Sequence, residues 1–406
     1  MARTSKTLPQ KIDTAHLISA GVLASVCPRA LIDEVLAKTG KASQRERLLP
    51  APAVVYYVMA LALWREAPLQ EVMRVVCEGL QWLGGGKTGA VQASKSAISQ
   101  ARTRLGSDVM KQLADRVLRP LARAGAPGGW YRGWRLMAVD GSCMDVADES
   151  ANAEHFGYPG ASRGQSAFPQ ARVLGLVECG THVVVGASIA PYKSSEVAMA
   201  AELLPPKLND EMLVMADRNF YSFKLWQKAS ASRARLLWRV KSNLLLPVQQ
   251  ELADGSYLSS VFDSQDPARQ NGQTVRVIDY TLKDSATPSQ SSYRLLTNIL
   301  EPQAAPALEL AALYHERWEI ESVFDEFKTH MRSASTVLRS KTPELVQQEL
   351  WGLLLAHFAI RQLMEQAACT QGLDPDRLSF TNALRVIKRK MPQAAALPPC
   401  AVASVA

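Results

Sequence analysis

Two short apolar segments that each end in an aspartate constrain the fold of this chain most strongly. RLMAVDG carries Asp140 at its end, and MLVMADR carries Asp217 in the same place. Apolar runs of this length beside turn residues are typical of buried strands. ARVLGLVECGTHVVVGASIA predicts a hairpin between them, SEVAMAAELL predicts a helix, and RLLWRVK predicts a further strand after a second helix. Strands that alternate with helices in this way predict a mixed α/β sheet.

The rest of the chain divides into regions of different character. Apolar residues recur at helical spacing through the first 125 residues, and AGAPGGWYRGW then has the composition of a linker. Further on, short β-like runs stand between DG, NG and DP turns and predict an inserted β-rich subdomain. We therefore expect a helical N-terminal domain at residues 1–125 and an α/β core in two parts, at 133–241 and 293–345. A β-rich insertion at 242–292 separates the two parts, and a helical C-terminal region follows at 346–406.

The bulk composition favours a soluble protein of a reducing compartment. The 406 residues are 47% hydrophobic and 21% charged, which is ordinary for a globular chain. Six cysteines without a CxxC pair and six histidines without metal-site spacing argue against a disulfide scaffold and a structural zinc site. The polar start MARTSKTLPQK lacks a signal-peptide core, and the longest apolar run, at 53–64, is too short to span a bilayer. We expect a cytoplasmic protein with no membrane partner.

Positive charge is concentrated in one part of the chain. The net charge is +8, and residues 101–135 alone hold eight Arg or Lys against two Asp. This excess permits a surface that faces phosphates, although a solvated helix face explains it as well. SKSAISQARTRLG carries Lys95, Arg102 and Arg104 after serines able to cap a helix. It predicts either the second helix of a DNA-reading helix-turn-helix or an amphipathic bundle helix.

YHERWEIESVFDEFK, residues 314–328, predicts a helix with an unusual stripe. At about 100° per residue, Arg317, Glu321 and Lys328 lie at roughly 300°, 340° and 320° from Tyr314. The stripe borders an apolar arc, so it belongs at the rim of the core. The predicted solvent face holds His315, Glu319, Ser322 and Glu326. Periodicity alone does not separate a site from a surface ion-pair ladder of Arg317 and Glu321.

Asp140, Asp217 and Glu321 are the acids whose positions suggest chemistry. A carboxylate beside a buried strand is costly unless a partner compensates it, and a divalent cation is one such partner. Oxygen ligands suit Mg²⁺ or Mn²⁺, and two ions about 4 Å apart can hold a phosphodiester. Each aspartate could instead serve as a turn or helix-cap residue. Asp145 is an alternative first ligand, but Asp140 ends the apolar strand directly.

At this point the chain resembles a known family. YHERWEIESVFDEFK fits the Y-x2-R-x3-E-x6-K signature of the insertion sequence 4 family of bacterial cut-and-paste transposases. AVDGSCMDVAD resembles the family's first-aspartate segment and LVMADRNFYS its second. FGYPGASRG, AFPQARVLGLVECGTH, DGSYLS and RERLLPAPAVVYYVMALALW also resemble members of this group. The resemblance covers roughly residues 15–390.

The resemblance implies an RNase H-like fold with a β-rich insertion before the glutamate helix. It implies a nucleoid-associated enzyme in which Asp140, Asp217 and Glu321 bind two Mg²⁺ ions, replaceable by Mn²⁺. The resemblance implies that water cleaves first at the transposon ends. In relatives the freed 3′-OH then attacks the opposite strand to form a hairpin, and later it attacks the target DNA. Tyr314, Arg317 and Lys328 are implied to hold terminal phosphates, with Tyr314 and Arg317 seating a flipped nucleotide. A homodimer on double-stranded DNA is implied by the joining of two ends.

Other interpretations remain open. GGGKTG at 84–89 has the look of a phosphate loop, but Gln81 stands where the first glycine belongs and the preceding segment is helical. An idle DNA-binding protein derived from a transposase is one rival, and a nuclease without strand transfer is another. Relatives often use an aromatic wedge from the insertion. The predicted insertion has no Trp, and its aromatic residues are only Tyr257, Phe262 and Tyr280, so the sequence does not identify a wedge or predict the hairpin step.

Overall fold

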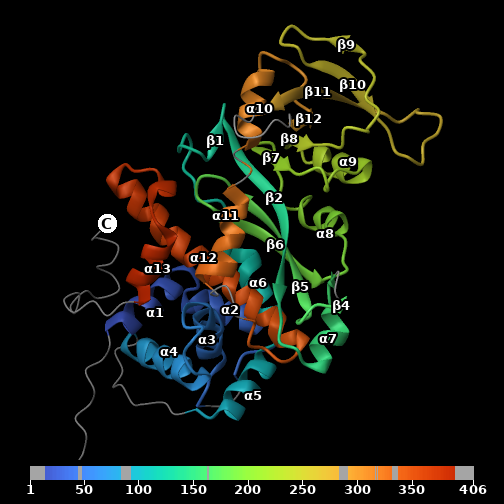
Figure 1. Ribbon diagram of the computed structural model, residues 1–406. Helices are drawn as coiled ribbons and strands as arrows, with labels where there is room; N and C mark the ends of the chain where they lie inside the picture. Colours follow the sequence, from blue (N-terminus) through green and yellow to red (C-terminus); the bar gives the residue numbers. More distant parts are fainter. Residues whose placement is uncertain are drawn as a thin grey trace, which may run out of the picture. The chain divides into compact units, whose positions relative to one another are not determined.

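The computed structural model describes residues 14–43, 48–83, 93–161, 164–282, 291–315, 317, 319–331 and 337–388 (Figure 1). The chain divides into two compact units, Met1–Val117 with Gln347–Leu373 and Arg377–Ala406, and Leu118–Val346 with Asp374–Asp376. The glycine-rich segment at 84–89 lies outside the described residues.

The first unit is helical, as the apolar spacing predicts. Its helices are α1 (Thr14–Val26), α2 (Arg29–Lys38), α3 (Ala51–Leu63), α4 (Leu69–Leu83), α5 (Lys95–Leu105), α6 (Ser107–Val117), most of α12 (Pro343–Gln371) and α13 (Phe380–Lys388). Helix α3 is apolar on every side and almost wholly buried. It passes so close to α12 that a Cβ on Gly352 would lie 2.7 Å from the backbone oxygen of Val58. Glycine is therefore required at this crossing. In the part of the chain that the structure describes, no helix is long and apolar enough to cross a membrane.

The second unit is built on a ten-stranded sheet of described residues (Figure 1). Its order is β6 (Val183–Pro191), β5 (Gln170–Glu178), β2 (Trp134–Asp145), β7 (Met212–Ala216), β8 (Arg235–Arg239), β12 (Ser291–Thr297), β11 (Gln273–Leu282), β10 (Tyr257–Val261) and β9 (Gln250–Glu251), with β1 (Trp130–Tyr131) paired to β2. The β2–β7 and β7–β8 pairs are parallel and the others antiparallel. A small hairpin joins β3 (Gly160–Ala161) to β4 (Gly164–Gln165). The mixed sheet confirms the predicted fold class.

The helices of this unit interrupt the strands where the sequence alternates. They are α7 (Ser150–Phe156), α8 (Glu196–Leu203), α9 (Phe223–Ala231), α10 (Ala307–His315), α11 (Glu319–Asp325) and the π-helical turn η2 (Glu326–His330), with a short 3-10 turn η3 at Pro375–Arg377. Ser195 and Ser222 cap α8 and α9 through their side-chain oxygens. Helix α11 packs on β2 (Figure 1).

The region predicted as an insertion contributes strands to the same sheet. β10 and β11 form where SYLSSVF and TVRVIDYTL predict strands, and β11 pairs with β12, which pairs with β8. The hydrogen-bond ladder of the core therefore continues through the inserted strands without a break.

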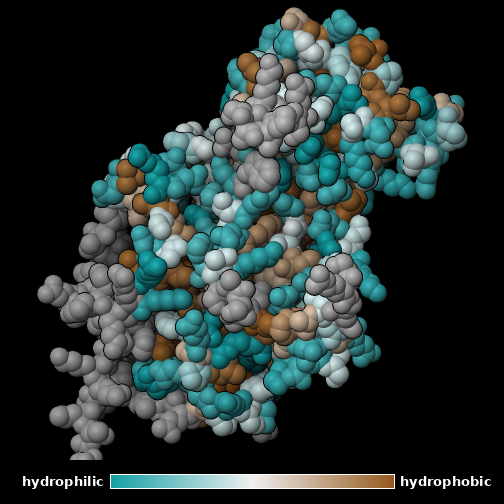
Figure 2. All heavy atoms as spheres, in the orientation of Figure 1, coloured by the Kyte–Doolittle hydropathy of each residue, from teal (hydrophilic) through white to brown (hydrophobic). Residues whose placement is uncertain are grey.

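Among the described residues visible in Figure 2, hydrophobic and hydrophilic side chains are interspersed over much of the surface. The most exposed large apolar side chains among the described residues come from several segments. These are Leu48, Leu245, Val248, Leu308, Leu373 and Val386. Such scattered side chains are normal for a globular protein.

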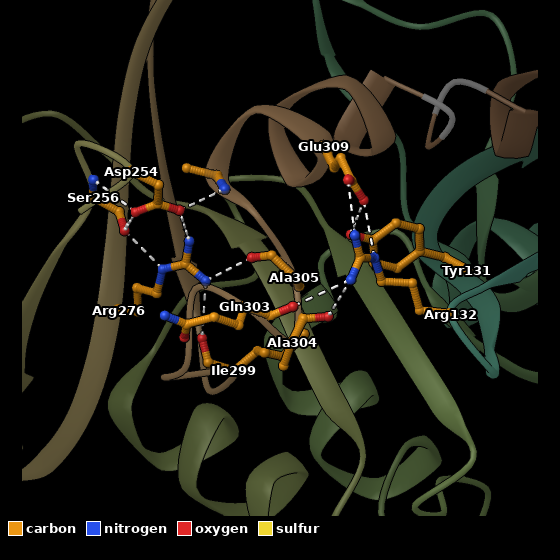
Figure 3. A network of polar contacts seen from close by, with 11 residues as sticks. Tyr131, Arg132, Asp254, Ser256, Arg276, Ile299, Gln303, Ala304, Ala305 and Glu309 are labelled. Carbon is orange, nitrogen blue, oxygen red and sulfur yellow. Dashed lines mark hydrogen bonds and ion pairs between the residues drawn. The ribbon is translucent and has the colours of Figure 1, made fainter. Parts of the chain in front are cut away.

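A buried arginine and its neighbours hold the start of α10, the helix that leads toward Glu321. Arg276 on β11 is fully buried and donates to Ser256 Oγ at 2.8 Å and to the Ala305 carbonyl at 2.7 Å. It also pairs with the Asp254 carboxylate, which accepts the first backbone N–H of α10, from Ala307, at 2.8 Å (Figure 3). The strands of the insertion are thus fastened to the start of α10.

The opposite side of α10 is held by the turn after β1. Arg132 pairs with Glu309 at 2.9 Å, and the Tyr131 hydroxyl donates to the same carboxylate at 2.7 Å (Figure 3). Arg132 also donates to the Gln303 carbonyl at 3.2 Å. Helix α10 is therefore anchored from two sides before the chain reaches Glu321.

Two local predictions are wrong. Strand β2 does not end at Asp140 but continues to Asp145, because β5 pairs with it along that whole length. The segment from Tyr314 to Lys328 is not one α-helix, since α10 ends at His315, α11 begins at Glu319 and the last turn is π-helical. A π turn holds more residues than an α turn, so the arithmetic of 100° per residue fails beyond Asp325.

Candidate active site

Asp140 and Asp217 are brought together by the parallel pairing of β2 with β7. The last paired residues are Val139 and Ala216, so the two aspartates follow side by side on neighbouring strands. Neighbouring strands are about 4.8 Å apart. Asp145 lies five residues further along β2, on the opposite face of the sheet, because side chains alternate along a strand. The structure therefore places Asp140, and not Asp145, beside Asp217.

The environment of Asp140 is unfavourable to its charge. Burial raises the pKa of the Asp140 carboxyl to about 6, against the lowering effects of the Gly141 backbone N–H and of Arg317. The nearby carboxylates of Glu196 and Asp217 raise this pKa further. Several acids therefore crowd one partly buried position, which a bound cation would relieve.

Glu196 is a member of this group that the sequence did not reveal. It stands in the first turn of α8 and pairs with Arg172 of β5. A Cβ on Gly141 would lie 2.5 Å from its Oε1 atom, so Glu196 can lie against β2 only because the residue after Asp140 is glycine. In the sequence, Gly141 is the one indication that another group lies close to β2 after Asp140. A glycine does not indicate that this group is the side chain of Glu196.

Glu321 reaches the site through Arg317. Arg317 Nη1 lies 3.4 Å from Asp140 Oδ2, and Nη2 lies 4.0 Å from Glu321 Oε1. Arg317 stands at the break between α10 and α11 and its side chain is only 8% exposed, whereas that of Glu321 is 51% exposed. One buried guanidinium thus lies between two of the three predicted acids.

Tyr314 and Lys328 occupy different surroundings. Tyr314 is 2% exposed, its hydroxyl donates to the Ala216 carbonyl at 3.3 Å, and its ring lies 5.8 Å from the Arg317 guanidinium carbon. It secures the end of β7 just before Asp217. Lys328 is exposed. Burial raises the pKa of the Cys143 thiol on β2, and the charges of Arg172 and Lys328 lower it. Contacts of Tyr314 and Lys328 with DNA stay predictions.

Comparison with known proteins decides the family. Residues 17–115 match the family description "Insertion element 4 transposase N-terminal", and residues 132–359 match "Transposase DDE domain". The chain belongs to the insertion sequence 4 family of DDE transposases. It is 28% identical over 369 residues to "Transposase InsG for insertion sequence element IS4" of Escherichia coli (strain K12), across 89% of this chain and 80% of that protein.

Two further comparisons are weaker. The transposase is 26% identical over 236 residues to "Putative transposase InsZ" of Escherichia coli (strain K12), across 58% of this chain and 74% of that protein. A solved piggyBac transposase synaptic complex with hairpin DNA aligns at 12% identity with a TM-score of 0.43, across 100% of this chain and 77% of that chain. The family match confirms the predicted resemblance, and with it a DNA transposase, an enzyme that acts on DNA with a divalent metal.

The predicted solvent face of the glutamate helix is partly wrong for this transposase. Glu326, the first residue of the π turn, is only 5% exposed. Glu319, at the start of α11, is also largely covered, with 15% of its side chain exposed. Ser322 is exposed as predicted.

An aromatic and cationic cluster of the transposase lies beside Tyr314. Tyr280 of β11 and Tyr293 of β12 stack with ring centroids 5.2 Å apart and planes 15° apart. His315 meets both rings edge-on, and the Arg239 guanidinium carbon lies 4.1 Å from the Tyr293 centroid. Of these residues only Tyr280 was a candidate from the sequence, since the strand pairing that brings the others together cannot be read from local composition.

The basic residues of α5 separate into two kinds. Lys95 and Arg104 are exposed, and Ser94 caps the helix that carries them. Arg102 is only 4% exposed and its Nε donates to Gln348 Oε1 at 2.8 Å. The predicted DNA contact of Arg102 is therefore corrected. This arginine packs inside the helical unit, because it falls on the inner face of α5 with Ile98 and Leu105.

Proposed function

We propose that the transposase cuts DNA at the terminal inverted repeats of its insertion sequence and joins the freed ends to target DNA. In this proposal Asp140, Asp217 and Glu321 are the catalytic acids, and they hold two Mg²⁺ ions that Mn²⁺ can replace. The observation that carries it is the position of Asp140 beside Asp217, with Arg317 bridging from Asp140 toward Glu321.

The residues present fit divalent ions of this kind. All the donors are carboxylate oxygens, which hard cations prefer. Burial, together with the nearby charges of Glu196 and Asp217, raises the pKa of Asp140, as expected where negative charge awaits a cation. When bound, such ions would activate the attacking oxygen and stabilise the leaving oxygen of a phosphodiester.

The side chains of the chain itself supply binding and orientation. Arg317 offers a bidentate donor set that suits a phosphate, and it lies between the acids that flank the scissile position. Lys328 adds an exposed cation, and Tyr314 holds the end of β7. The stacked tyrosines Tyr280 and Tyr293 offer a flat face on which an extruded base can stack.

DNA binding outside this site rests on Lys95 and Arg104 of α5, which contact backbone phosphates in this proposal. Because two ends must be held for joint insertion, the active assembly is a homodimer on DNA. A nucleoid location follows from that substrate.

The proposal is tested by incubating purified protein with DNA that carries its insertion-sequence ends and Mg²⁺. Wild type is expected to release ends with a free 3′-OH and to join them to a second DNA, and Glu321→Gln is expected to bind the ends without cutting them. Glu154→Gln, an exposed acid of α7, is the matched control and should behave as wild type.

Each rival has its own outcome. Binding without any Mg²⁺-dependent cleavage by wild type would show an idle DNA-binding protein. Cleavage without joining would show a nuclease. A hairpin at the released end would show that the first attack is on the opposite strand.

A further inference from the structure

Three side chains from distant parts of the chain meet at one point outside the acids described above. His182 Nε2 lies 3.5 Å from Glu319 Oε2 and 3.3 Å from Asp376 Oδ1. The three ligand atoms lie within 4.8 Å of one another. His182 belongs to the turn between β5 and β6, Glu319 opens α11, and Asp376 lies in the 3-10 turn η3. None of the three residues of this His182 cluster is among those assigned to the proposed reaction.

The distances are those of ligands around a metal. A good N–H···O hydrogen bond spans about 2.7–3.2 Å, which is shorter than either contact. Nitrogen and oxygen ligands at about 2.0–2.2 Å from a tetrahedral zinc ion stand roughly 3.3–3.6 Å from one another. Both contacts of His182 fall within that range. The two carboxylates also lie against the same imidazole nitrogen, an arrangement that a cation between them stabilises.

The backbone around His182 is held firmly in place. The Gly180 N–H donates to Glu319 Oε2 at 2.5 Å. Gly180 has a φ of +78°, and a Cβ on it would lie 2.6 Å from the Gly129 nitrogen, so the turn presses against the preceding linker. His182 itself has a φ of 57°, in the left-handed region where histidine is one of the better-tolerated residues. The imidazole is therefore presented by a rigid turn.

The cluster is more open to solvent on one side than on the other. The side chains of His182 and Glu319 are 12% and 15% exposed, whereas that of Asp376 is 30% exposed. Solvent therefore reaches the site from the Asp376 side. Three protein ligands with one open position suit a water molecule as the fourth ligand.

The geometry points to a second metal centre, a single Zn²⁺ ion held by His182 Nε2, Glu319 and Asp376 with water completing a tetrahedron. Imidazole with two carboxylates suits zinc and neighbouring transition metals and does not suit Mg²⁺. The ion ties Glu319 to the β5–β6 turn. Glu319 is the first residue of α11 and stands two residues before Glu321. Its binding does not depend on the proposed function, but its effect on Glu321 does.

Sequence spacing alone argued against a structural zinc site. The three ligands stand at positions 182, 319 and 376, and no local motif joins them. Only the packing of α11 and of the 374–376 segment against the β5–β6 turn brings them together.

The test uses full-length Asp140→Asn protein, in which the proposed Mg²⁺ site is weakened. The protein is stripped with a chelator, and then Zn²⁺ or Co²⁺ alone is added. We expect one Zn²⁺ per chain retained on dialysis, a Co²⁺ visible spectrum of the tetrahedral type, and a higher melting temperature with Zn²⁺. His182→Gln in the same background should lose all three signals, and His155→Gln, an exposed histidine of α7, should keep them.

Two milder variants protect the test against misfolding. Glu319→Gln keeps an acceptor for the Gly180 N–H, and Asp376→Asn keeps the side-chain size, so each should fold normally by circular dichroism. Each should weaken Zn²⁺ binding by at least about 10-fold, because a metal ligand is lost. Unchanged Zn²⁺ binding in folded His182→Gln, or in both of these variants, would overturn the second metal centre. Folded Asp140→Asn protein that binds no Zn²⁺ would also overturn the second metal centre. The cluster would then be an imidazolium paired with two carboxylates.

A further comparison separates this site from the proposed reaction. In otherwise wild-type protein, His182→Gln is expected to lower Mg²⁺-dependent cleavage while leaving the affinity for end DNA unchanged, because α11 loses its tether. Zn²⁺ binding that persists in a protein with no cleavage at all would leave the second metal centre intact and defeat only the proposed function.

Discussion

Arg317 Nη1 lies 3.4 Å from Asp140 Oδ2 in a position where the arginine side chain is almost wholly buried. The same guanidinium approaches Glu321 at 4.0 Å. This guanidinium is a positive charge between Asp140 of β2 and Glu321 of α11. Its removal should therefore affect proton and metal binding as well as DNA contact.

Arg317→Gln should shift the pH dependence of cleavage. The Arg317 charge lowers the pKa of Asp140, which burial raises to about 6, so its loss raises that pKa further. Protonated Asp140 cannot bind a cation, and the acid limb of Mg²⁺-dependent cleavage is expected to move to higher pH. A pH–rate profile checks this, with Arg317→Lys as the variant that keeps the charge. A uniform fall at every pH would contradict the electrostatic role.

Asp140→Asn should stabilise the metal-free protein. Because the folded state raises the pKa of Asp140 from 3.8 to about 6, ionisation destabilises the fold; this penalty is absent below about pH 3.8 and complete above about pH 6. At about 1.4 kcal/mol per unit it amounts to at most about 3 kcal/mol at pH 8.

Urea unfolding in the presence of a chelator measures this effect. The stability advantage of Asp140→Asn over wild type should be largest at pH 8 and shrink towards pH 4. Mg²⁺ should then stabilise wild type much more than the variant. Equal stability of the two proteins at pH 8 without metal would show that Asp140 carries no such penalty.

Arg276→Met should weaken the fold strongly. The arginine is fully buried and pairs with Asp254, so its loss leaves a partly buried carboxylate without its charge partner (Figure 3). Removal of one partner of such a pair costs about 3–5 kcal/mol. Lys341→Met, which breaks an exposed pair with Glu149, should cost about 1 kcal/mol or less. Denaturant unfolding of both variants compares them, and equal losses would disprove the anchoring role of Arg276.

The basic residues of α5 should differ in their effect on DNA binding. Lys95→Gln and Arg104→Gln should each reduce the slope of log affinity against log salt concentration by about 0.9, the value for one lost phosphate contact. Arg102→Met should leave that slope unchanged and lower the melting temperature, because Arg102 bonds to Gln348 inside the helical unit. Affinity titrations at several salt concentrations decide between these roles.

Much of the fold could be read from local patterns, because strands and helices have characteristic periods. The apolar segments before Asp140 and Asp217 form neighbouring strands, and the segments around Tyr257 and Val277 form strands of the predicted insertion. The neighbouring positions of Asp140 and Asp217 follow directly from the pairing of their strands.

The remainder depended on contacts between distant segments. The Glu196 side chain reaches Asp140 only because α8 packs beside Gly141. Glu326 is buried although its sequence spacing predicts a solvent-facing side chain, because α10 ends at His315 and α11 begins anew at Glu319. Arg102 and Arg104 stand two residues apart, yet only packing reveals that one faces inward and the other faces solvent.

The continuous ladder from β6 to β9 has a mechanical consequence. A sheet held by uninterrupted hydrogen bonds has no hinge between the strands that carry Asp140 and those of the insertion. Force applied by DNA on β9 or β10 would travel through β11, β12 and β8 as a change of twist and reach the ends of β7 and β2. The insertion therefore extends the sheet that carries Asp140, and it could be exchanged for another only by a replacement that rebuilds the pairing with β12.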